Sequence, residues 1–256
     1  MGRDPGPGGP GRYFDSTGIM LDIIQNHLLQ VLCLVAMEGP SSLDEGDLRR
    51  PKIEVLRAVK WLSPEELRRR TVHARYGEGR IGDRDIPAYM DEEGVDPDRR
   101  TETFAEITLE VDNRRWAGVP FVLRTGKALG RDLGEVAVHF RPASHPAFGQ
   151  PEAPRPKVLH LVEGPDPVVL DVNVGGSADP FEPKQIELGT VLTPQSPSAY
   201  GHLLLDALEG NPSLFVHAEE SWRIVEPIIE AWEKDEVPLL EYPAGSYGPA
   251  QRLALP

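Results

Sequence analysis

The sequence is poor in cysteine, because Cys33 is the only one among its 256 residues. A single cysteine excludes an internal disulfide and fits a reducing compartment. Leucines surround Cys33 in the sequence, and no feature that lowers a thiol pKa is nearby, so we predict a packed thiol rather than a nucleophile. Histidine, cysteine and carboxylate residues do not cluster at the spacing of metal ligands either, so we expect no metal site.

Positive charge is also scarce. The chain has 27 lysines and arginines against 41 aspartates and glutamates, which gives a formal net charge of -14. Such a chain is repelled by phosphate backbones and anionic lipids unless its basic residues cluster. Arginines do occur in pairs and triplets, but acidic residues surround most of them. We therefore expect no nucleic-acid or membrane partner.

Long apolar runs are missing as well. No window approaches the ~18 uninterrupted apolar residues of a membrane span. The first residues also lack the basic segment and apolar run of a secretory signal. These absences predict a cytoplasmic protein. With 39% hydrophobic residues, the chain can still bury a sizeable core.

Glycine and proline dominate residues 1–12, which predicts a disordered lead-in before one domain over residues 13–256. Within this lead-in, Gly6, Gly8 and Gly11 match the G-x-G-x-x-G spacing of a dinucleotide-binding turn. Such a turn needs a strand before it and a helix after it. Here prolines alternate with the glycines and no strand pattern precedes them, so we interpret the match as fortuitous.

Hydrophobic periodicity predicts the fold class. Spacings of three and four predict helices at about 16–38, 43–62, 199–208 and 219–233, and Ser63 is expected to cap a short helix of its own. Residues 77–100 are polar and irregular. A period of two predicts strands at about 101–111, 119–124, 136–140, 158–162, 168–174 and 186–192. Short turns join these strands, so we predict an α+β fold with a large, mostly antiparallel sheet covered by helices on one face.

The first predicted helix carries a polar cluster near its start, formed by Asp22, Gln25, Asn26 and His27. The first three can bond to residues three or four positions away on the same helix face. His27 is harder to explain, because its helical neighbours are apolar and its imidazole must enter the core or the rim of a pocket. From the residues alone, we favour a core histidine that hydrogen-bonds to the backbone.

Several blocks of this sequence, between Tyr13 and Pro249, resemble the glucose-6-phosphate dehydrogenase family. The first block holds the family's Asp and Gln-Asn-His signature, and the second holds its Trp-x-Gly-Val-Pro-Phe and Arg-x-Gly-Lys elements. Three shorter matches follow in the family's order. In chain order, the blocks are "YFDSTGIMLDIIQNHLLQVLCLVAME", "TETFAEITLEVDNRRWAGVPFVLRTGKAL", "AYGHLLLDALEGNPSLFV", "SWRIVEPII" and "YPAGSYGP".

The resemblance implies a role for the polar cluster. It matches His27 to the general base that takes the C1 hydroxyl proton of glucose 6-phosphate while hydride leaves for NADP. It matches Asp22 to the carboxylate that binds the sugar hydroxyls. An imidazole suits the first task, because its unperturbed pKa is about 6.5. Residues five apart lie about 140° apart around an ideal α-helix, so we expect Asp22 and His27 to contact different sides of the ligand.

Further binding residues are implied by the second block. Lys127 matches the lysine that contributes to the sugar phosphate site, and Arg124 lies on the same element. A dianionic phosphate favours such cations. Glu163 falls where some members of the family carry a polar, sugar-contacting residue.

The chain departs from the family pattern at several points. It has no strand, glycine-rich turn and helix in succession to bind NADP. The Arg-Ile-Asp-His-Tyr-Leu-Gly-Lys signature is missing, so His27 lacks its orienting carboxylate, a loss that costs about four orders of magnitude in hydrolase triads. Asp132 follows Arg131 where the family has a further cation, Gly201 replaces a glutamate, and Tyr247 replaces the arginine of a second NADP site.

Two functions are therefore open. In the first, the chain is the substrate-binding half of an NADP-dependent glucose-6-phosphate dehydrogenase, which forms 6-phosphogluconolactone in the pentose phosphate pathway. It would act as a homo-oligomer or paired with a coenzyme-domain chain, and the isolated chain would be weak or inactive. In the second, it is a non-catalytic truncated homologue that serves as an oligomerisation domain. Asp22, His27 and Lys127 favour the first function, and the missing coenzyme elements favour the second.

Overall fold

The structure is a computed structural model that describes residues 10–42, 45–132, 134–141, 155–162, 167–175, 183–191 and 218–251. The chain divides into two compact units, which are unit 1 (Met1–Arg131 and His202–Pro256) and unit 2 (Asp132–Gly201). Residues 1–9 of the expected lead-in lie outside the described residues, and the first helix begins at Pro10. The helix expected at about 199–208 also lies outside them.

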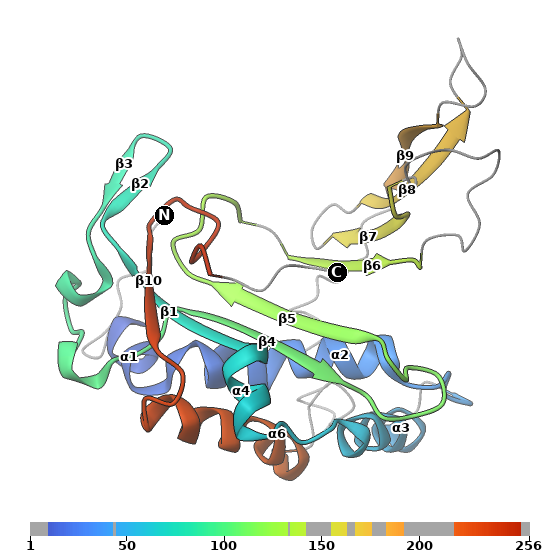
Figure 1. Ribbon diagram of the computed structural model, residues 1–256, viewed down its shortest axis with the longest axis horizontal. Coiled ribbons are helices and arrows are strands. Elements are labelled where there is room, and N and C mark those ends of the chain that lie inside the picture. The colour runs from blue at the N-terminus through green and yellow to red at the C-terminus, as the bar shows by residue number, and fades with distance from the viewer. Residues whose placement is uncertain are drawn as a thin grey trace. The chain divides into compact units, whose positions relative to one another are not determined.

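Unit 1 contains all of the described helices. They are α1 (Pro10–Ile19), the π-helix η1 (Met20–Leu28), α2 (Leu29–Ala36), α3 (Glu45–Ala58), α4 (Pro64–Arg70), the 3₁₀ helices η2 (Tyr89–Asp91) and η3 (Pro97–Arg99), and α6 (Ala218–Glu233). The described strands of unit 1 are β1 (Thr71–Gly77), β2 (Gly79–Ile81), β3 (Arg84–Ile86), β4 (Phe104–Glu110), β5 (Pro120–Gly126) and β10 (Leu239–Pro243) (Figure 1).

Four of these strands form one sheet in the order β10-β1-β4-β5. β4 pairs antiparallel with both β1 and β5, whereas β1 pairs in parallel with β10 near the other end of the chain. Strands β2 and β3 form a separate hairpin inside the segment that we expected to be irregular. The sequence patterns predicted β4 and β5 but missed β1 and β10.

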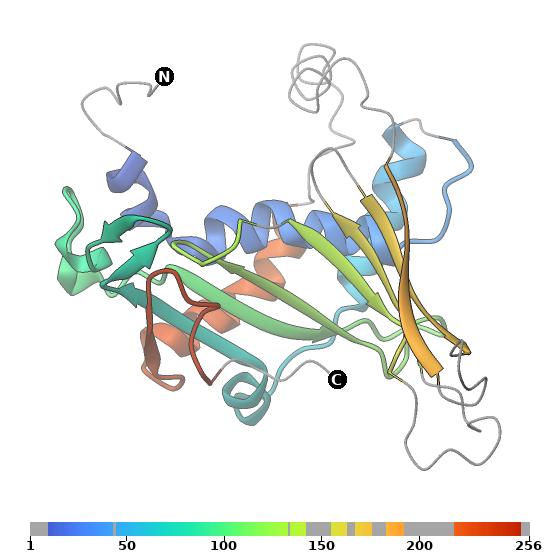
Figure 2. The same ribbon diagram turned by 90° about the horizontal axis from the view of Figure 1, so that it is seen from above.

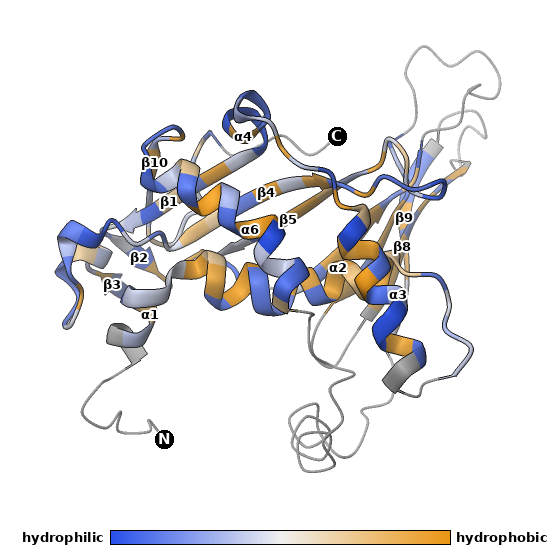
Figure 3. Cartoon of the chain, turned by 90° about the horizontal axis from the view of Figure 1, so that it is seen from below, coloured by the Kyte–Doolittle hydropathy of each residue, from blue (hydrophilic) through white to orange (hydrophobic). Residues whose placement is uncertain are grey.

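Helices cover one face of this sheet. The run α1, η1 and α2 extends alongside β5, and α6 lies on the same side of the sheet (Figures 1 and 2). α6 is amphipathic, with hydrophobic and hydrophilic residues alternating along it in Figure 3. Its Val225 and Ile228 are almost fully buried, as are Ile24 of η1 and Leu29 of α2. Their burial removes apolar surface from water and stabilises unit 1.

The short helix α4 starts where the sequence predicted. The Ser63 hydroxyl accepts a hydrogen bond from the Glu66 N–H, and the Glu66 carboxylate accepts one from the Ser63 N–H. This reciprocal pair is a capping box, and it satisfies N–H groups that have no partner inside the helix. Pro64 occupies the first helical position, where its missing N–H costs nothing.

One helical run, Tyr13–Ala36, is long and apolar enough by length and composition to cross a membrane. Core helices pass the same test. In this structure the run packs against β5, α3 and α6 within unit 1, so it serves as a core helix. It is also the run that carries the polar cluster.

Unit 2 contains a second four-stranded sheet. Its strands β6 (Glu135–His139), β7 (Val158–Val162), β8 (Pro167–Gly175) and β9 (Pro183–Val191) pair antiparallel in chain order. Side chains alternate between its two faces. The register places one apolar set together, which we call the apolar face; it consists of Val136, Val138, Leu159, Leu161, Val168, Leu170, Val172, Val174, Ile186 and Leu188.

These elements confirm the predicted fold class. The protein is α+β, and every described strand pair except β1 with β10 is antiparallel. The strands form two four-stranded sheets and one hairpin. Helices cover one face of the sheet in unit 1, as expected.

Candidate functional site

Asp22 and His27 both lie on η1, a nine-residue π-helix in the middle of the core helical run. π-Helices form i→i+5 hydrogen bonds, are rare, and occur frequently at functional sites. One such bond runs from the Leu29 N–H to the Ile24 carbonyl oxygen. Residues five apart are therefore about one turn apart and lie near the same side of the helix. This corrects the angle of about 140° that ideal α-helical geometry predicted for Asp22 and His27.

The polar cluster divides between the core and the surface. Gln25 is buried, and its Nε2 donates to Ser221 Oγ of α6 at 3.4 Å. Asn26 is exposed and donates to the Leu21 carbonyl oxygen at 2.9 Å. Asp22 is half-buried and His27 is exposed. The core position that the residues alone favoured for His27 is wrong, because the structure leaves this side chain exposed.

A different histidine occupies the core of unit 1. His73 on β1 is buried, stacks on the Trp232 ring with 4.4 Å between centroids, and has its Nε2 2.9 Å from the Val237 carbonyl oxygen. Burial lowers the pKa of His73 to about 4. A buried imidazole that stays neutral and stacks on a tryptophan ring is unsuited to proton transfer with a ligand, so His73 has a structural role.

Lys127 follows β5 directly and is exposed. Its ammonium nitrogen lies 3.8 Å from the ring centroid of Phe14 on α1, which is a cation–π contact. β5 packs against η1. The fold thus brings Lys127 beside the helical run that carries Asp22 and His27.

Arg124 lies on β5 opposite Glu106 of β4, and its guanidinium forms an ion pair with that carboxylate. Glu106 is fully buried, so this pair neutralises a charge that would otherwise be costly inside the sheet. A role for Arg124 in substrate binding stays a prediction. The other predicted binding residue, Glu163, lies outside the described residues.

The sequence patterns gave no sign of the role of Asp15, which lies inside α1 and ties this helix to residues between Tyr89 and Thr101. Its buried carboxylate accepts hydrogen bonds from the Tyr89 hydroxyl at 3.0 Å and the Asp96 N–H at 3.1 Å. Its carbonyl oxygen accepts one from the Thr101 hydroxyl at 2.7 Å. The acid in "YFDSTG" was visible in the sequence, but its partners are 74 or more residues away. Local patterns could not identify them.

Cys33 is buried and packed, with its Sγ 3.7 Å from the Lys52 carbonyl oxygen. Burial raises the pKa of its thiol to about 12, although nearby Lys52 opposes the shift. A thiol with such a pKa is almost entirely protonated near neutrality. Cys33 is therefore a core residue rather than a nucleophile.

The described residues contain no group of three or more histidine, cysteine or acidic side chains that could hold a metal ion. The nearest approach is in unit 2, where His160 Nδ1 contacts Glu135 and His160 Nε2 lies 3.3 Å from Asp171. The two carboxylates bind opposite nitrogens of one ring and do not converge on a common point. The hydrogen bond with Glu135 raises the pKa of His160.

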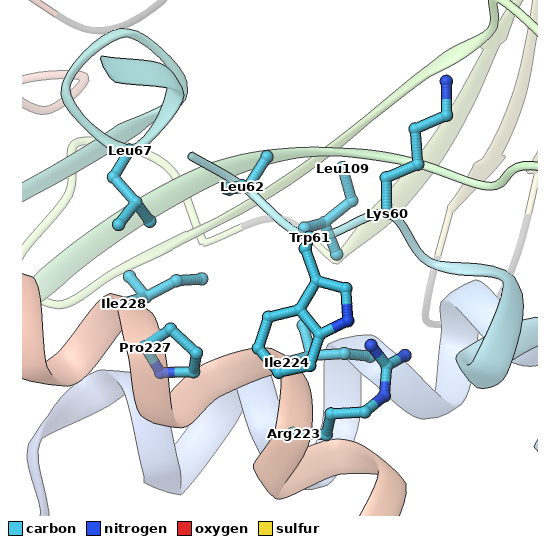
Figure 4. Close-up of a pocket in the computed structure, with 9 residues that line it drawn as sticks. All are labelled: Lys60, Trp61, Leu62, Leu67, Leu109, Arg223, Ile224, Pro227 and Ile228. Atoms are coloured by element: carbon cyan, nitrogen blue, oxygen red, sulfur yellow. The ribbon is translucent and has the colours of Figure 1, made fainter. Parts of the chain in front are cut away.

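Two clefts elsewhere in unit 1 are poor candidates for a sugar phosphate. The first, drawn in Figure 4, has a volume of about 10 Å³, which is room for roughly one water molecule. The second, of about 360 Å³, lies along α3 and is lined by Arg49, Arg50 and Arg57, of which Arg50 pairs with Glu54 and Arg57 with Glu220. Neither cleft contains a residue of the predicted site.

The described residues do not fit a dinucleotide such as NADP. Within the described ranges, no strand leads through a glycine-rich turn into a helix, which is the arrangement that binds its pyrophosphate. The parallel pair of β1 and β10 is not a substitute, because β1 leads into the β2–β3 hairpin.

Comparisons with known proteins agree with this arrangement. A family model described as "Glucose-6-phosphate dehydrogenase, C-terminal domain" matches residues 3–255. A curated relative named glucose-6-phosphate 1-dehydrogenase, from Gluconobacter oxydans, is 42% identical over 96% of this chain and 52% of its own length. A relative of the same name from Mycolicibacterium smegmatis is 40% identical over 98% of this chain and 52% of its own length. The chain thus spans about half the length of these relatives.

Solved structures give the same result. A glucose-6-phosphate dehydrogenase in complex with its substrate glucose 6-phosphate superposes with a TM-score of 0.79 at 33% identity, over 97% of this chain and 52% of that chain. The enzyme from Mycobacterium avium gives a TM-score of 0.77 at 32% identity, over 97% of this chain and 51% of that chain. The chain therefore belongs to the glucose-6-phosphate dehydrogenase family and corresponds to its C-terminal domain.

Proposed function

We propose that this chain binds glucose 6-phosphate and supplies the general base for its oxidation, as the substrate-binding half of a glucose-6-phosphate dehydrogenase. One observation carries the proposal: Asp22 and the exposed His27 lie near the same side of a π-helix, and Lys127 lies beside the same helical run. A relative of similar fold binds this substrate.

Each side chain has a chemical task in the proposed complex. Lys127 binds the phosphate, since an ammonium group and a phosphate dianion form strong, charge-assisted hydrogen bonds. Asp22 accepts hydrogen bonds from the sugar hydroxyls. His27 accepts the proton of the C1 hydroxyl, a step for which imidazole is suited near neutral pH. Arg124 and Glu163 are assigned to further contacts with the ligand.

The coenzyme is assigned to another part of the enzyme. The family implies NADP, but the described residues do not fit it, so we assign its binding to a coenzyme domain on a longer polypeptide or a separate chain. The complete reaction would yield 6-phosphogluconolactone in the pentose phosphate pathway, in the cytoplasm. This chain contributes substrate binding and the proton acceptor.

Calorimetry with glucose 6-phosphate tests the binding, with glucose as the ligand that lacks phosphate. We expect Lys127→Ala to weaken binding about ten- to a hundredfold, because a charged hydrogen bond contributes roughly 1.5–3 kcal/mol. The matched control Lys234→Ala removes an exposed lysine that pairs with Glu230, and it should leave the affinity unchanged. Equal affinity for glucose and glucose 6-phosphate would contradict the assignment of Lys127.

A mixture with NADP tests the catalytic assignment. We expect no NADPH from the chain with glucose 6-phosphate and NADP alone, and turnover once a coenzyme domain of the family is added. His27→Ala should abolish that turnover, whereas His139→Ala, at an exposed histidine of unit 2, should preserve it. Full turnover in the His27 variant would exclude this residue as the base.

The apolar face of unit 2 favours a second function, which is self-association. Four of its side chains are strongly exposed, at 53% for Leu188, 40% for Leu161 and Ile186, and 37% for Val174. Contiguous exposed apolar surface of this kind marks interaction sites. We assign a second copy of the chain as the partner, and sedimentation equilibrium tests it. A single monomeric species at all concentrations would contradict this assignment.

A further inference from the structure

Two consecutive residues just before β4, Glu102 and Thr103, contact both halves of the proposed site. Glu102 binds the backbone where the helical run enters η1, and Thr103 binds the backbone of Lys127. Neither residue belongs to the set that the sequence suggested as ligand-binding. Their connection to the site rests on the proposed function.

On the helix side, the chain breaks at Gly18 and restarts as a new helical segment. Gly18 has φ of 70° and ψ of 167°, a region that essentially only glycine adopts. The Ile19 N–H then donates to the Glu102 carbonyl oxygen at 3.3 Å, and the Met20 N–H donates to Glu102 Oε1 at 3.0 Å. Glu102 thus supplies partners to N–H groups that have none inside the helix.

The Glu102 carboxylate is enclosed by this turn. A Cβ atom on Gly18 would lie 2.5 Å from Glu102 Oε1, so the carboxylate lies directly against the glycine. Burial raises the pKa of Glu102, while the N–H groups around it oppose the shift. A carboxylate also suits the positive end of a helix dipole. Asp22 lies two residues after Met20, so the same contact fixes the turn that carries it.

On the lysine side, both backbone groups of Lys127 are held. Its N–H donates to the Thr103 carbonyl oxygen at 2.8 Å, and its carbonyl oxygen accepts from the Tyr242 hydroxyl at 2.7 Å. The Thr103 hydroxyl lies 3.1 Å from that Tyr242 hydroxyl. Ala128 follows with φ of 50°, a conformation that non-glycine residues rarely adopt.

We propose that Glu102 is a positioning residue, which fixes the π-helix carrying Asp22 and His27 relative to Lys127. The link is short, because the residue that holds the helix and the residue that holds the lysine are neighbours in the chain. A sugar phosphate must contact its hydroxyl-binding and phosphate-binding groups at one fixed separation. An error of about 1 Å in such a separation weakens productive binding and catalysis strongly.

The test compares three Glu102 variants in calorimetry with glucose 6-phosphate. Glu102→Ala removes the acceptor, and Glu102→Asp withdraws it by one methylene while keeping the charge. Glu102→Gln keeps an oxygen for the Met20 N–H. We expect the Kd to rise about tenfold or more in the first two and to stay within about threefold of the unaltered chain in the third.

Glu110→Ala is the matched control. Glu110 ends β4, the strand that follows Glu102, and pairs with Lys60 and Arg70, away from the helix start. This variant should lower the stability of unit 1 without changing the Kd. A Kd that is unchanged in Glu102→Asp, or that rises equally in Glu110→Ala, would reduce Glu102 to a structural cap and overturn the proposal.

Amide hydrogen exchange separates this proposal from the proposed function. If the unaltered chain does not bind glucose 6-phosphate, the proposed function fails, but the positioning can still be measured. In Glu102→Asp, the Met20 amide should exchange about tenfold faster, and the amide resonances of Asp22 and His27 should shift, while Glu110→Ala changes neither. Unchanged exchange and shifts in Glu102→Asp would overturn the positioning role.

Discussion

The two four-stranded sheets of this chain differ in what covers them. In unit 1, helices pack on the sheet, and Phe104, Ala105, Glu106 and Ile107 of β4 are all fully buried. In unit 2, Val158 is the only side chain that the structure describes as buried, and four of the ten side chains of the apolar face are exposed. A sheet is stabilised mainly by the apolar surface that it buries against other elements. Unit 1 therefore has a core of its own, whereas the described residues of unit 2 bury little apolar surface.

The largest expected effect comes from the core of unit 1. Phe104 is fully buried, its ring packs edge-on against Tyr242 with 5.7 Å between centroids, and it also contacts Gly126 and Gly248. Phe104→Ala should lower the free energy of unfolding by about 3–5 kcal/mol, because it removes apolar contacts and leaves a cavity. Urea unfolding followed by tryptophan fluorescence measures this, since Trp61, Trp116, Trp222 and Trp232 all lie in unit 1.

The matched change in unit 2 is Leu170→Ala on β8, at a half-buried position of the apolar face. We expect less than half of the loss in free energy that Phe104→Ala causes, because less apolar surface is buried there. Amide hydrogen exchange in β7 and β8 follows this unit. Equal losses at the two positions would show that unit 2 has a core of its own, contrary to the comparison.

A second pair of substitutions compares glycines. Gly18→Ala places a Cβ against the Glu102 carboxylate and forces alanine into a glycine-only conformation, so we expect a loss of about 1–3 kcal/mol or more. At Gly189 of β9, a Cβ would lie 3.4 Å from Val169, which is an ordinary contact. Gly189→Ala should be neutral or stabilising by about 0.4–1 kcal/mol. Thermal unfolding of both variants checks this, and a stable Gly18→Ala chain would contradict the strained turn.

Local signals explain what the sequence predicted about the fold. The apolar period of α6 and the cap at Ser63 act over a few residues, so α6 was predicted close to its observed bounds and α4 at its observed start. β1 and β10 were missed, because they pair in parallel across more than 160 residues and neither has a distinctive alternation. The π-helix was missed because its apolar period is close to that of an α-helix.

The sequence identified some residues of the candidate site, but it did not predict their exposure or their long-range contacts. Asp22, His27 and Lys127 were identified through motifs, but the side of the helix that faces solvent depends on tertiary packing. The residues alone therefore placed His27 in the core, and the structure places it on the surface. Glu102 was missed because its contact with Met20 joins positions 82 residues apart. Long-range contacts of this kind leave no local pattern.

With rising pH, His160 and His73 change the stability of their units in opposite directions. Hydrogen bonding to Glu135 raises the pKa of His160 above its ordinary value of 6.5, so its contribution to stability is present below about pH 6.5 and is lost as the pH rises through the folded value. Burial lowers the pKa of His73 to about 4, so its contribution is present above about pH 6.5 and is lost as the pH falls towards 4.

His160→Gln should therefore flatten the alkaline loss of stability in unit 2. We expect an effect of about 0.2–1 kcal/mol between pH 5.5 and 8, as for other partly exposed ion pairs. Amide exchange in β7 and β8 measures it, and His139→Gln, at an exposed histidine of β6, is the control. If unit 2 has the same pH dependence with and without His160, the contacts with Glu135 and Asp171 do not stabilise it.

The smallest expected effect on stability is at Leu188, and it tests the apolar face most directly. Leu188→Ser should change the free energy of unfolding of the monomer by less than about 0.5 kcal/mol, because the side chain is 53% exposed. It should nevertheless shift sedimentation towards the monomer. Glu187→Ser, one residue earlier and on the opposite face, is the control and should leave association unchanged. If both variants associate like the unaltered chain, the apolar face does not carry the self-association, and the assignment of a second copy as its partner is wrong.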